Sequence, residues 1–140
     1  MVAVSGSVIS ASKSEEPKLQ TTILYVAEGR ASFETAVSRL LTTVHLPPDR
    51  AVLTTPAMIG LMEHCVGLAE SEGAADAEVG TWQSAVAEIR HRAGLKTGET
   101  VILTAEREVP QAKRTRWSVR AAAGDGRLIG EGVIERVRVK

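Results

Sequence analysis

Three polar side chains stand where they could do chemistry, and the first is a carboxylate inside an apolar run. The run reads "TTPAMIGLMEHC", residues 54–65, and Glu63 is its acidic residue. In a low-dielectric interior an unpaired carboxylate is costly, and without donors around it becomes a stronger base than in water. The alternative is that Glu63 reaches solvent or a subunit interface and pairs with an arginine. The residue pattern leaves both interpretations open.

The second candidate is Thr55, because the run around Glu63 predicts a helix from Thr54 to about Ser71. Thr55 is the expected N-cap, and Pro56 suits the first helical position, where its missing N–H costs nothing. Residues 57–69 are apolar on every side apart from Glu63 and its neighbour, which is typical of an enclosed helix. Gly60 and Gly67 each cost about 1 kcal/mol in a helix interior, so we expect something to approach the backbone closely there.

The third candidate is His91, at the end of the predicted strand "TWQSAVAEIRHR". Alternation puts His91 on the apolar face, toward the layer where the helix packs. A histidine that only donates to a neighbouring carbonyl is the structural alternative. The expected apolar face holds Ala85, Ala87, Ile89 and His91, the other face holds Ser84, Glu88, Arg90 and Arg92, and Val86 is the exception.

The spacing of these residues limits how one ligand can reach them. Thr55 and Glu63 are eight residues apart, about 12 Å along the helix axis, so a ligand that touches both lies along the helix. His64 lies about 100° around the helix from Glu63, and we expect it to be a core or boundary residue.

The elements that position these residues form an α+β domain. Residues 1–17 read as a flexible N-terminal tail, and 18–140 as a single domain. Strands are expected in "LQTTILYVAEG", "RASFETAV" and, more briefly, "LLTTVHL" before the helix. After it come four strands, the last two joined by the hairpin turn "GDGR". In the final strand Gly130 and Gly132 indicate a bulge or a close backbone approach.

Composition narrows the class of protein. The 140 residues carry 17 basic and 17 acidic side chains, which argues against electrostatic capture of nucleic acid. No apolar segment approaches the ~20 residues that span a bilayer, so we expect a cytoplasmic protein that does not enter the membrane. The single Cys65 excludes an intramolecular disulfide, and with three histidines it makes a poor metal set, so no metal is expected. A lone helix under long strands would be poorly covered at its ends, which favours a homodimer.

The motifs together resemble a known family. "TTPAMIGLME", the Gly80–Thr81 pair that opens a strand, and His91 followed by "GLKTGETV" are similar to the hot dog fold thioesterases of the fluoroacetyl-CoA thioesterase type. The resemblance covers roughly residues 29–139. It implies a hot dog fold, an antiparallel β-sheet wrapped around a long central helix, in a dimer.

The resemblance also implies an activity and a site. The activity is hydrolysis of a small or medium acyl-CoA thioester, with no cofactor besides the coenzyme A that is part of the substrate. Thr55, Glu63 and His91 are the implied catalytic set at a dimer interface, with Glu63 as base or nucleophile. No aromatic residue stands in "HLPPDRAVL", where the fluoroacetyl-specific enzyme carries a lid phenylalanine, so fluoroacetyl specificity does not follow. Substrate contacts are assigned to Met58, Ile59, Gly60, Arg90 and Arg92.

Two other functions remain open at this point. One is a non-catalytic module that holds an acyl-CoA or a small apolar ligand in the same groove. The other is a hot dog hydratase or dehydratase, whose usual Asp and His arrangement is not visible in this sequence. For CoA phosphates we expect a basic rim, drawn from Arg90, Arg92, Lys96, Lys113, Arg114 and Arg116.

Overall fold

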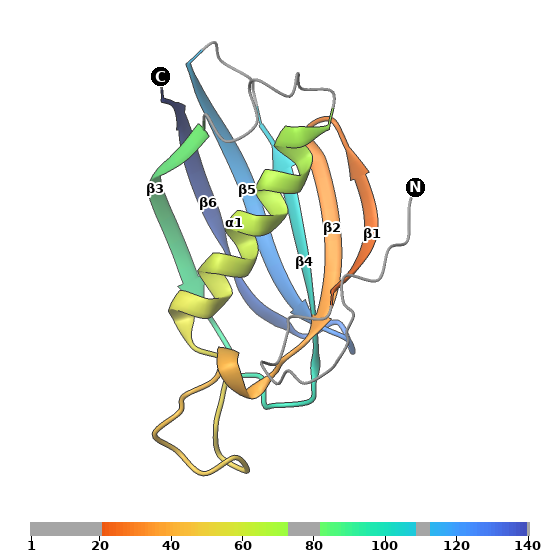
Figure 1. Ribbon diagram of the computed structural model, residues 1–140, viewed down its shortest axis with the longest axis vertical. Helices are drawn as coiled ribbons and strands as arrows, with labels where there is room; N and C mark the ends of the chain where they lie inside the picture. Colours follow the sequence, from red (N-terminus) through yellow and green to blue (C-terminus); the bar gives the residue numbers. More distant parts are fainter. Residues whose placement is uncertain (1–20, 73–81, 109–112, 140) are drawn as a thin grey trace, which may run out of the picture.

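One long helix lies across one face of an antiparallel sheet (Figure 1). This computed structural model describes residues 21–72, 82–108 and 113–139. The expected tail 1–17, the Gly80–Thr81 pair and the link at Pro110 lie outside the described residues. The elements are β1 (Thr21–Ala27), β2 (Arg30–Ala36), the 3-10 turn η1 (Arg39–Leu41), α1 (Thr55–Ser71), β3 (Trp82–His91), β4 (Thr100–Arg107), β5 (Arg114–Ala123) and β6 (Leu128–Arg138).

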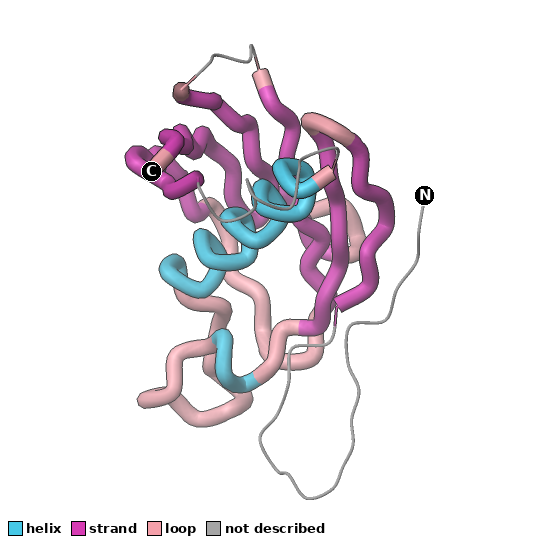
Figure 2. The backbone as a smooth tube through the Cα atoms, turned by 45° about the horizontal axis from the view of Figure 1, so that its top comes forward, coloured by secondary structure: helices cyan, strands magenta, loops and turns pink. Residues whose placement is uncertain are grey.

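The sheet has six strands in the order β1-β2-β4-β5-β6-β3, and every neighbouring pair is antiparallel. The strands curve around one side of α1, as Figure 2 shows. The expected hot dog arrangement is therefore confirmed. Because β1 and β3 are the edges, β3 carries His91 on a strand that has a sheet neighbour on one side only.

The core lies between α1 and the sheet and is built from small and medium apolar side chains. Along β5 buried and exposed residues alternate, as expected for a sheet with one face on the core. α1 contributes one buried stripe at helical spacing: Met58, Leu61, Met62, Cys65, Val66 and Ala69. Each large side chain buried in this way contributes about 1.5–3 kcal/mol.

The helix is not enclosed within one chain, contrary to the expectation. Thr55, Pro56, Gly60 and His64 of α1 are exposed. No described atom comes within 4 Å of a Cβ built at Gly60 or Gly67, leaving aside each residue's neighbours and the helix backbone. The close approach predicted at these glycines is therefore not made within the described part of this chain.

The segment "LLTTVHL" is a loop and not the short strand that we expected. Backbone bonds from Leu41 to Ser38 and from Thr42 to Arg39 close the 3-10 turn instead. The Arg39 guanidinium then donates to the carbonyls of Val44 and Leu46, at 3.0 and 2.7 Å. The pairing of this segment with residues 52–54 is limited to an isolated bridge between Thr42 and Leu53.

A bulge in β3 changes the expected register of its first half. The pairing with β6 shifts between Ser84 and Val86, so Ser84 does not share the face of Arg90. Its hydroxyl instead accepts a bond from Arg136, which also forms a two-bond ion pair with Glu70 of α1. Beyond the bulge, Ile89 packs against the core as predicted.

The glycines of β6 allow a close approach, as predicted. Gly130 lies opposite His91, and a Cβ on it would be 2.5 Å from the Met58 sulfur. Gly132 lies opposite Ile89, and a Cβ there would collide with the Glu88 carbonyl oxygen and lie 2.8 Å from Ile89 Cα. These contacts fix how near the end of β3 can come to β6 and to α1.

We expect Gly132→Ala to destabilise the fold by about 1–3 kcal/mol, because the added methyl overpacks the β3–β6 contact. Urea denaturation measures the change in free energy of unfolding. Gly124→Ala is the matched control, since a Cβ there would meet Thr100 at an ordinary 3.7 Å. Equal stability of the two variants would contradict the close approach.

The Cys65 thiol should be inert in the folded protein. Burial raises its pKa from 9.0 to about 12. Because the folded pKa is the higher one, the stability that the protonated thiol contributes is complete below pH 9 and is lost as the pH rises toward 12. At pH 8 we expect a thiol-specific reagent to label Cys65 only when urea is added. Labelling of the native protein at the urea rate would contradict its burial.

Candidate active site

At the start of α1 the hydroxyl of Thr55 is not used to cap the helix. Thr54, and not Thr55, is the N-cap: it is extended, and its hydroxyl accepts from the Ala57 N–H at 3.2 Å. Thr55 is the first helical residue, and Pro56 follows at the second position. The prediction was wrong by one residue because Thr54 and Thr55 are equally good caps and proline is tolerated throughout the first turn. As a result, Thr55 is available for another contact.

That contact is with His91. The Thr55 Oγ1 atom lies 2.7 Å from His91 Nδ1, a short hydrogen bond between two residues 36 positions apart. His91 is the last residue of β3 and is half-buried, on the side of the strand that faces α1. The structure therefore brings together two of the three predicted catalytic residues.

The second ring nitrogen of His91 is buried and has no partner among the described residues. His91 Nε2 makes no hydrogen bond there although the atom is shielded from solvent. A buried polar atom without a partner costs about 1–3 kcal/mol, so such an atom is common where a ligand or water supplies the missing bond. With Nδ1 held by Thr55, Nε2 is the nitrogen left for chemistry.

Glu63 is not part of this contact within one chain. It lies two turns beyond Thr55, about 12 Å farther along the helix axis. Its side chain is half-buried and forms no ion pair or hydrogen bond with a described residue. Both sequence interpretations of Glu63, a paired carboxylate and an enclosed base, therefore need a group from outside the described chain.

The three helix residues assigned to the substrate differ in exposure. Met58 is fully buried against Gly130, beside His91. Ile59 is half-buried and Gly60 is exposed. Together they form the turn of α1 between Thr55 and Glu63, so they lie along the path that a ligand touching both would follow.

Arg90 and Arg92 lie on the other face of the sheet from His91. Arg90 precedes His91 in β3 and Arg92 follows the end of the strand, and alternation directs their side chains away from α1. They line a hollow of about 930 Å³ on the outer face of the sheet. As the structure places them, they do not face the Thr55–His91 pair.

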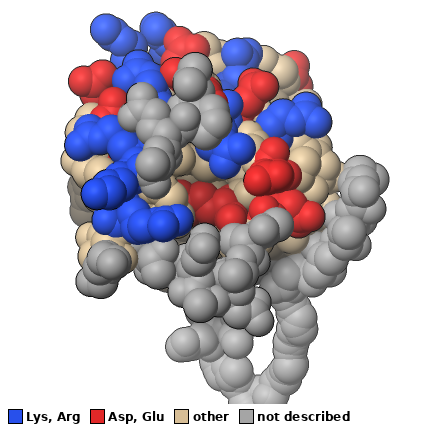
Figure 3. Space-filling view, turned by 90° about the horizontal axis from the view of Figure 1, so that it is seen from above, with Lys and Arg blue, Asp and Glu red and all other residues tan. Residues whose placement is uncertain are grey.

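The rest of the expected basic rim is divided between two ends of the molecule. Lys96 pairs through its backbone with Val52, in the segment that leads to α1. Lys113, Arg114 and Arg116 lie near the beginning of β5, at the opposite end from the start of α1 (Figure 1). At that end basic and acidic side chains lie next to one another, as Figure 3 shows, and Arg114 and Arg116 both pair with Glu135.

Three features of this region were missed by the sequence analysis. The cap at Thr54 had a signal, since two threonines precede the proline. The contact between Met58 and Gly130 had a weaker signal, since a glycine within a strand indicates a close approach but does not name the residue that approaches. The Thr55–His91 bond had none, because nothing in a single sequence gives the distance between a helix start and a strand end. Among the described residues, no group of three or more His, Cys, Asp or Glu side chains is placed to bind a metal ion.

Comparison with known proteins identifies the family. The model of the family described as fluoroacetyl-CoA-specific thioesterase (FlK) matches residues 33–140 of this chain. A search of curated proteins found no match. Within the described residues, no helix has both the length and the apolar character needed to cross a membrane.

Solved structures agree with this assignment. The fluoroacetyl-CoA thioesterase FlK is 28% identical, with 79% of this chain and 85% of that chain covered and a TM-score of 0.68. AziG of S. sahachiroi is 20% identical, with 87% and 91% covered and a TM-score of 0.69. A hypothetical thioesterase from Streptococcus pneumoniae TIGR4, solved with coenzyme A, is 11% identical, with 86% and 88% covered and a TM-score of 0.68.

The last two share the fold, and the first is also similar in sequence. The family model covers the helix with its Thr55 and Glu63, and the strand that ends in His91. The chain therefore belongs to the fluoroacetyl-CoA-specific thioesterase family and is an acyl-CoA thioesterase with the hot dog fold.

Proposed function

We propose that Thr55, Glu63 and His91 form the reaction site at which a small or medium acyl-CoA thioester is hydrolysed. The observation that carries this proposal is the hydrogen bond between Thr55 and His91, which leaves a buried His91 Nε2 without a partner among the described residues. The family supplies the reaction type, and these contacts support the choice of Thr55 and His91.

In this proposal Thr55 and His91 hold the thioester and Glu63 acts on it. The carbonyl oxygen lies near His91 Nε2, which donates to it when the proton is on that nitrogen. Few helix amides are left for this role, since Pro56 has no N–H and the Ala57 N–H is bonded to Thr54. Glu63 either activates a water that attacks the carbonyl, or attacks the carbonyl itself to form a mixed anhydride that water then hydrolyses. In both cases the C–S bond breaks, the acyl group leaves as the free acid, and CoA leaves as the thiol with a proton from the water.

The acyl group lies along the turn between Thr55 and Glu63. Gly60 is exposed and has no Cβ, so an acyl chain can lie against the helix backbone there. Met58 closes the space beside His91 because its sulfur already rests on Gly130. A small or medium acyl group fits this arrangement better than a long one.

We further propose a homodimer formed through the edge strand β3. Ala85, Val86 and Ala87 are exposed on this strand, and an unpaired edge with apolar residues tends to pair with another strand. Leu40 and Val44, in the segment 40–46 before α1, are 64% and 70% exposed. A second chain that covers these residues would also cover the exposed side of α1.

The dimer supplies the group that Glu63 lacks. Ile59 is midway between Thr55 and Glu63, so two antiparallel helices related by a two-fold axis beside Ile59 set Glu63 of each chain level with Thr55 of the other. Each reaction site then combines Thr55 and His91 of one chain with a carboxylate from its partner.

We propose that the reaction needs no cofactor, because coenzyme A takes part only as a portion of the substrate. The neighbour from Streptococcus pneumoniae was solved with coenzyme A, which supports a CoA ester as the ligand here. Lys96 pairs through its backbone with Val52 in the segment that leads to α1, so of the predicted basic rim it is the residue that we assign to the CoA phosphates. The cytoplasmic location stays a prediction from the sequence.

A panel of acyl-CoA thioesters tests the activity. We expect thiol release from short and medium members, reduced about 10²- to 10⁴-fold in Glu63→Ala and in His91→Ala, because each change removes a group that acts on the carbonyl. Thermal unfolding checks that the variants remain folded. His64→Ala is the matched control: it lies next to Glu63 but contacts Phe33 edge-on, so activity should stay. Tight CoA-ester binding without turnover of any panel member would support the binding module instead.

Mixed dimers test which chain supplies Glu63. Glu63→Ala and His91→Ala subunits, each nearly inactive, are unfolded, mixed and refolded together. If the site is shared, a mixed dimer contains one intact site, so an equal random mixture should regain about a quarter of wild-type activity. If all three residues act within one chain, every site contains one of the two substitutions and no activity returns. Refolded single variants are the controls, and gel filtration gives the oligomeric state.

A further inference from the structure

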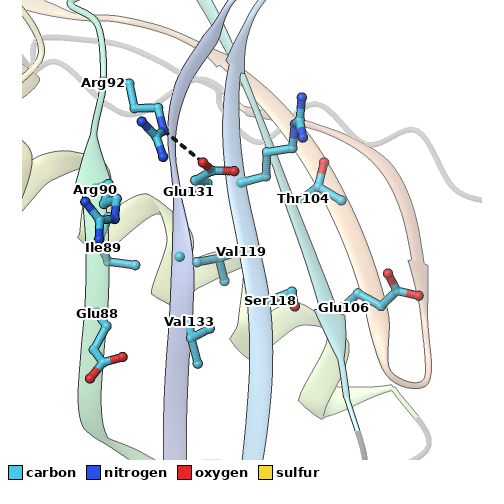
Figure 4. A pocket seen from close by; sticks show the side chains of 12 residues that line it. Glu88, Ile89, Arg90, Arg92, Thr104, Glu106, Ser118, Val119, Glu131 and Val133 are labelled. Atoms are coloured by element: carbon cyan, nitrogen blue, oxygen red, sulfur yellow. Dashed lines mark hydrogen bonds and ion pairs between the residues drawn. The ribbon is translucent and has the colours of Figure 1, made fainter.

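The hollow on the outer face of the sheet has charges arranged in two cross-strand rows (Figure 4). In the first row Arg90, Glu131, Arg120 and Thr104 lie opposite one another on β3, β6, β5 and β4. In the second row, two residues along each strand, lie Glu88, Val133, Ser118 and Glu106. The rows are about 7 Å apart, since a strand advances about 3.3 Å per residue.

The first row carries two guanidinium groups that are not used within the described chain. Arg92, Arg114 and Arg116 are each paired with a carboxylate at 2.8–3.0 Å. Arg90 and Arg120, in contrast, make no side-chain ion pair or hydrogen bond with any described residue. Glu131 lies between them but its carboxylate is held by Arg92. The row therefore presents net positive charge with free planar donors, which suit a carboxylate or phosphate.

The second row has the opposite character. Glu88 and Glu106 are exposed and, within the described residues, form no side-chain ion pair or hydrogen bond. Ser118 donates to Glu108 at 2.7 Å, and Val133 forms an apolar floor between the acidic residues. An anion seated in the first row would therefore have carboxylates one row away, and a second negative group on the same ligand would be repelled.

We propose that this hollow binds a small zwitterionic ligand. Its carboxylate or phosphate lies at Arg90 and Arg120, its short apolar middle crosses Val133, and its ammonium lies at one of the acidic residues of the second row. The site is on the opposite face of the sheet from Thr55 and His91, so it does not depend on how the thioester is hydrolysed.

Three probes of equal chain length test the charge pattern: ε-aminocaproate, adipate and hexamethylenediamine. They place a zwitterion, a dianion and a dication across the same six carbons. In an NMR titration of the full chain we expect saturable shifts of backbone amides around Arg120 and Glu131 with ε-aminocaproate, and affinity about tenfold lower for the other two.

Variants show whether the rows are responsible. Arg90→Ala with Arg120→Ala should weaken ε-aminocaproate binding about tenfold, whereas Arg114→Ala on the same face should leave it unchanged. Glu88→Gln with Glu106→Gln should reverse the preference toward adipate. Heat denaturation shows that each variant is folded.

Two results would overturn the proposal. One is the absence of a saturable shift with ε-aminocaproate, or a shift that the paired arginine variant does not change. The other is a shift of the same amides on raising the protein concentration without ligand, which would assign the face to a second copy of the chain. Neither result bears on thioester hydrolysis, which the acyl-CoA panel measures separately.

Discussion

The contact between Met58 and Gly130 sets the geometry on which the rest of the molecule depends. Met58, in the first turns of α1, rests on Gly130 of β6, a position that has no Cβ. His91 of the neighbouring strand β3 is paired with Gly130 in the sheet. The helix start and the end of β3 are thereby brought together, which is how Thr55 Oγ1 comes within 2.7 Å of His91 Nδ1. A larger residue at Gly130 would have to displace the thioether end of Met58.

The other end of α1 is fixed by charge and not by close packing. Arg136 of β6 pairs with Glu70 through two bonds and also reaches Ser84 at the β3 bulge. Both charged side chains are only 13–14% exposed, and breaking such a pair from one side costs about 3–5 kcal/mol. The helix is therefore held at both ends against the same edge strand, which leaves its outward face, with Gly60 and Glu63, open to a partner chain and a ligand.

The two faces of the sheet carry different chemistry because of alternation along β3. His91 faces the helix, while Arg90 and Arg92 face outward, although the three are consecutive in sequence. The expected substrate set therefore divides between the face that packs on α1 and an outer hollow about 930 Å³ in volume. Adjacency in sequence was a poor guide to shared function here, since neighbouring strand residues point in opposite directions.

By itself the sequence determined the α+β class, the extent of α1, the four strands after it and the identity of Thr55, Glu63 and His91 as candidates, because periodicity, capping residues and motif spacing are local properties. Only the tertiary structure decided that Thr54 caps the helix, that "LLTTVHL" is a loop, and that a bulge turns Ser84 toward Arg136. It also decided that Thr55 bonds to His91 while Glu63 is left without a partner among the described residues. These outcomes depend on distances between segments far apart in the chain, and those distances follow from how closely the helix and two strands pack at Gly130 and Gly132.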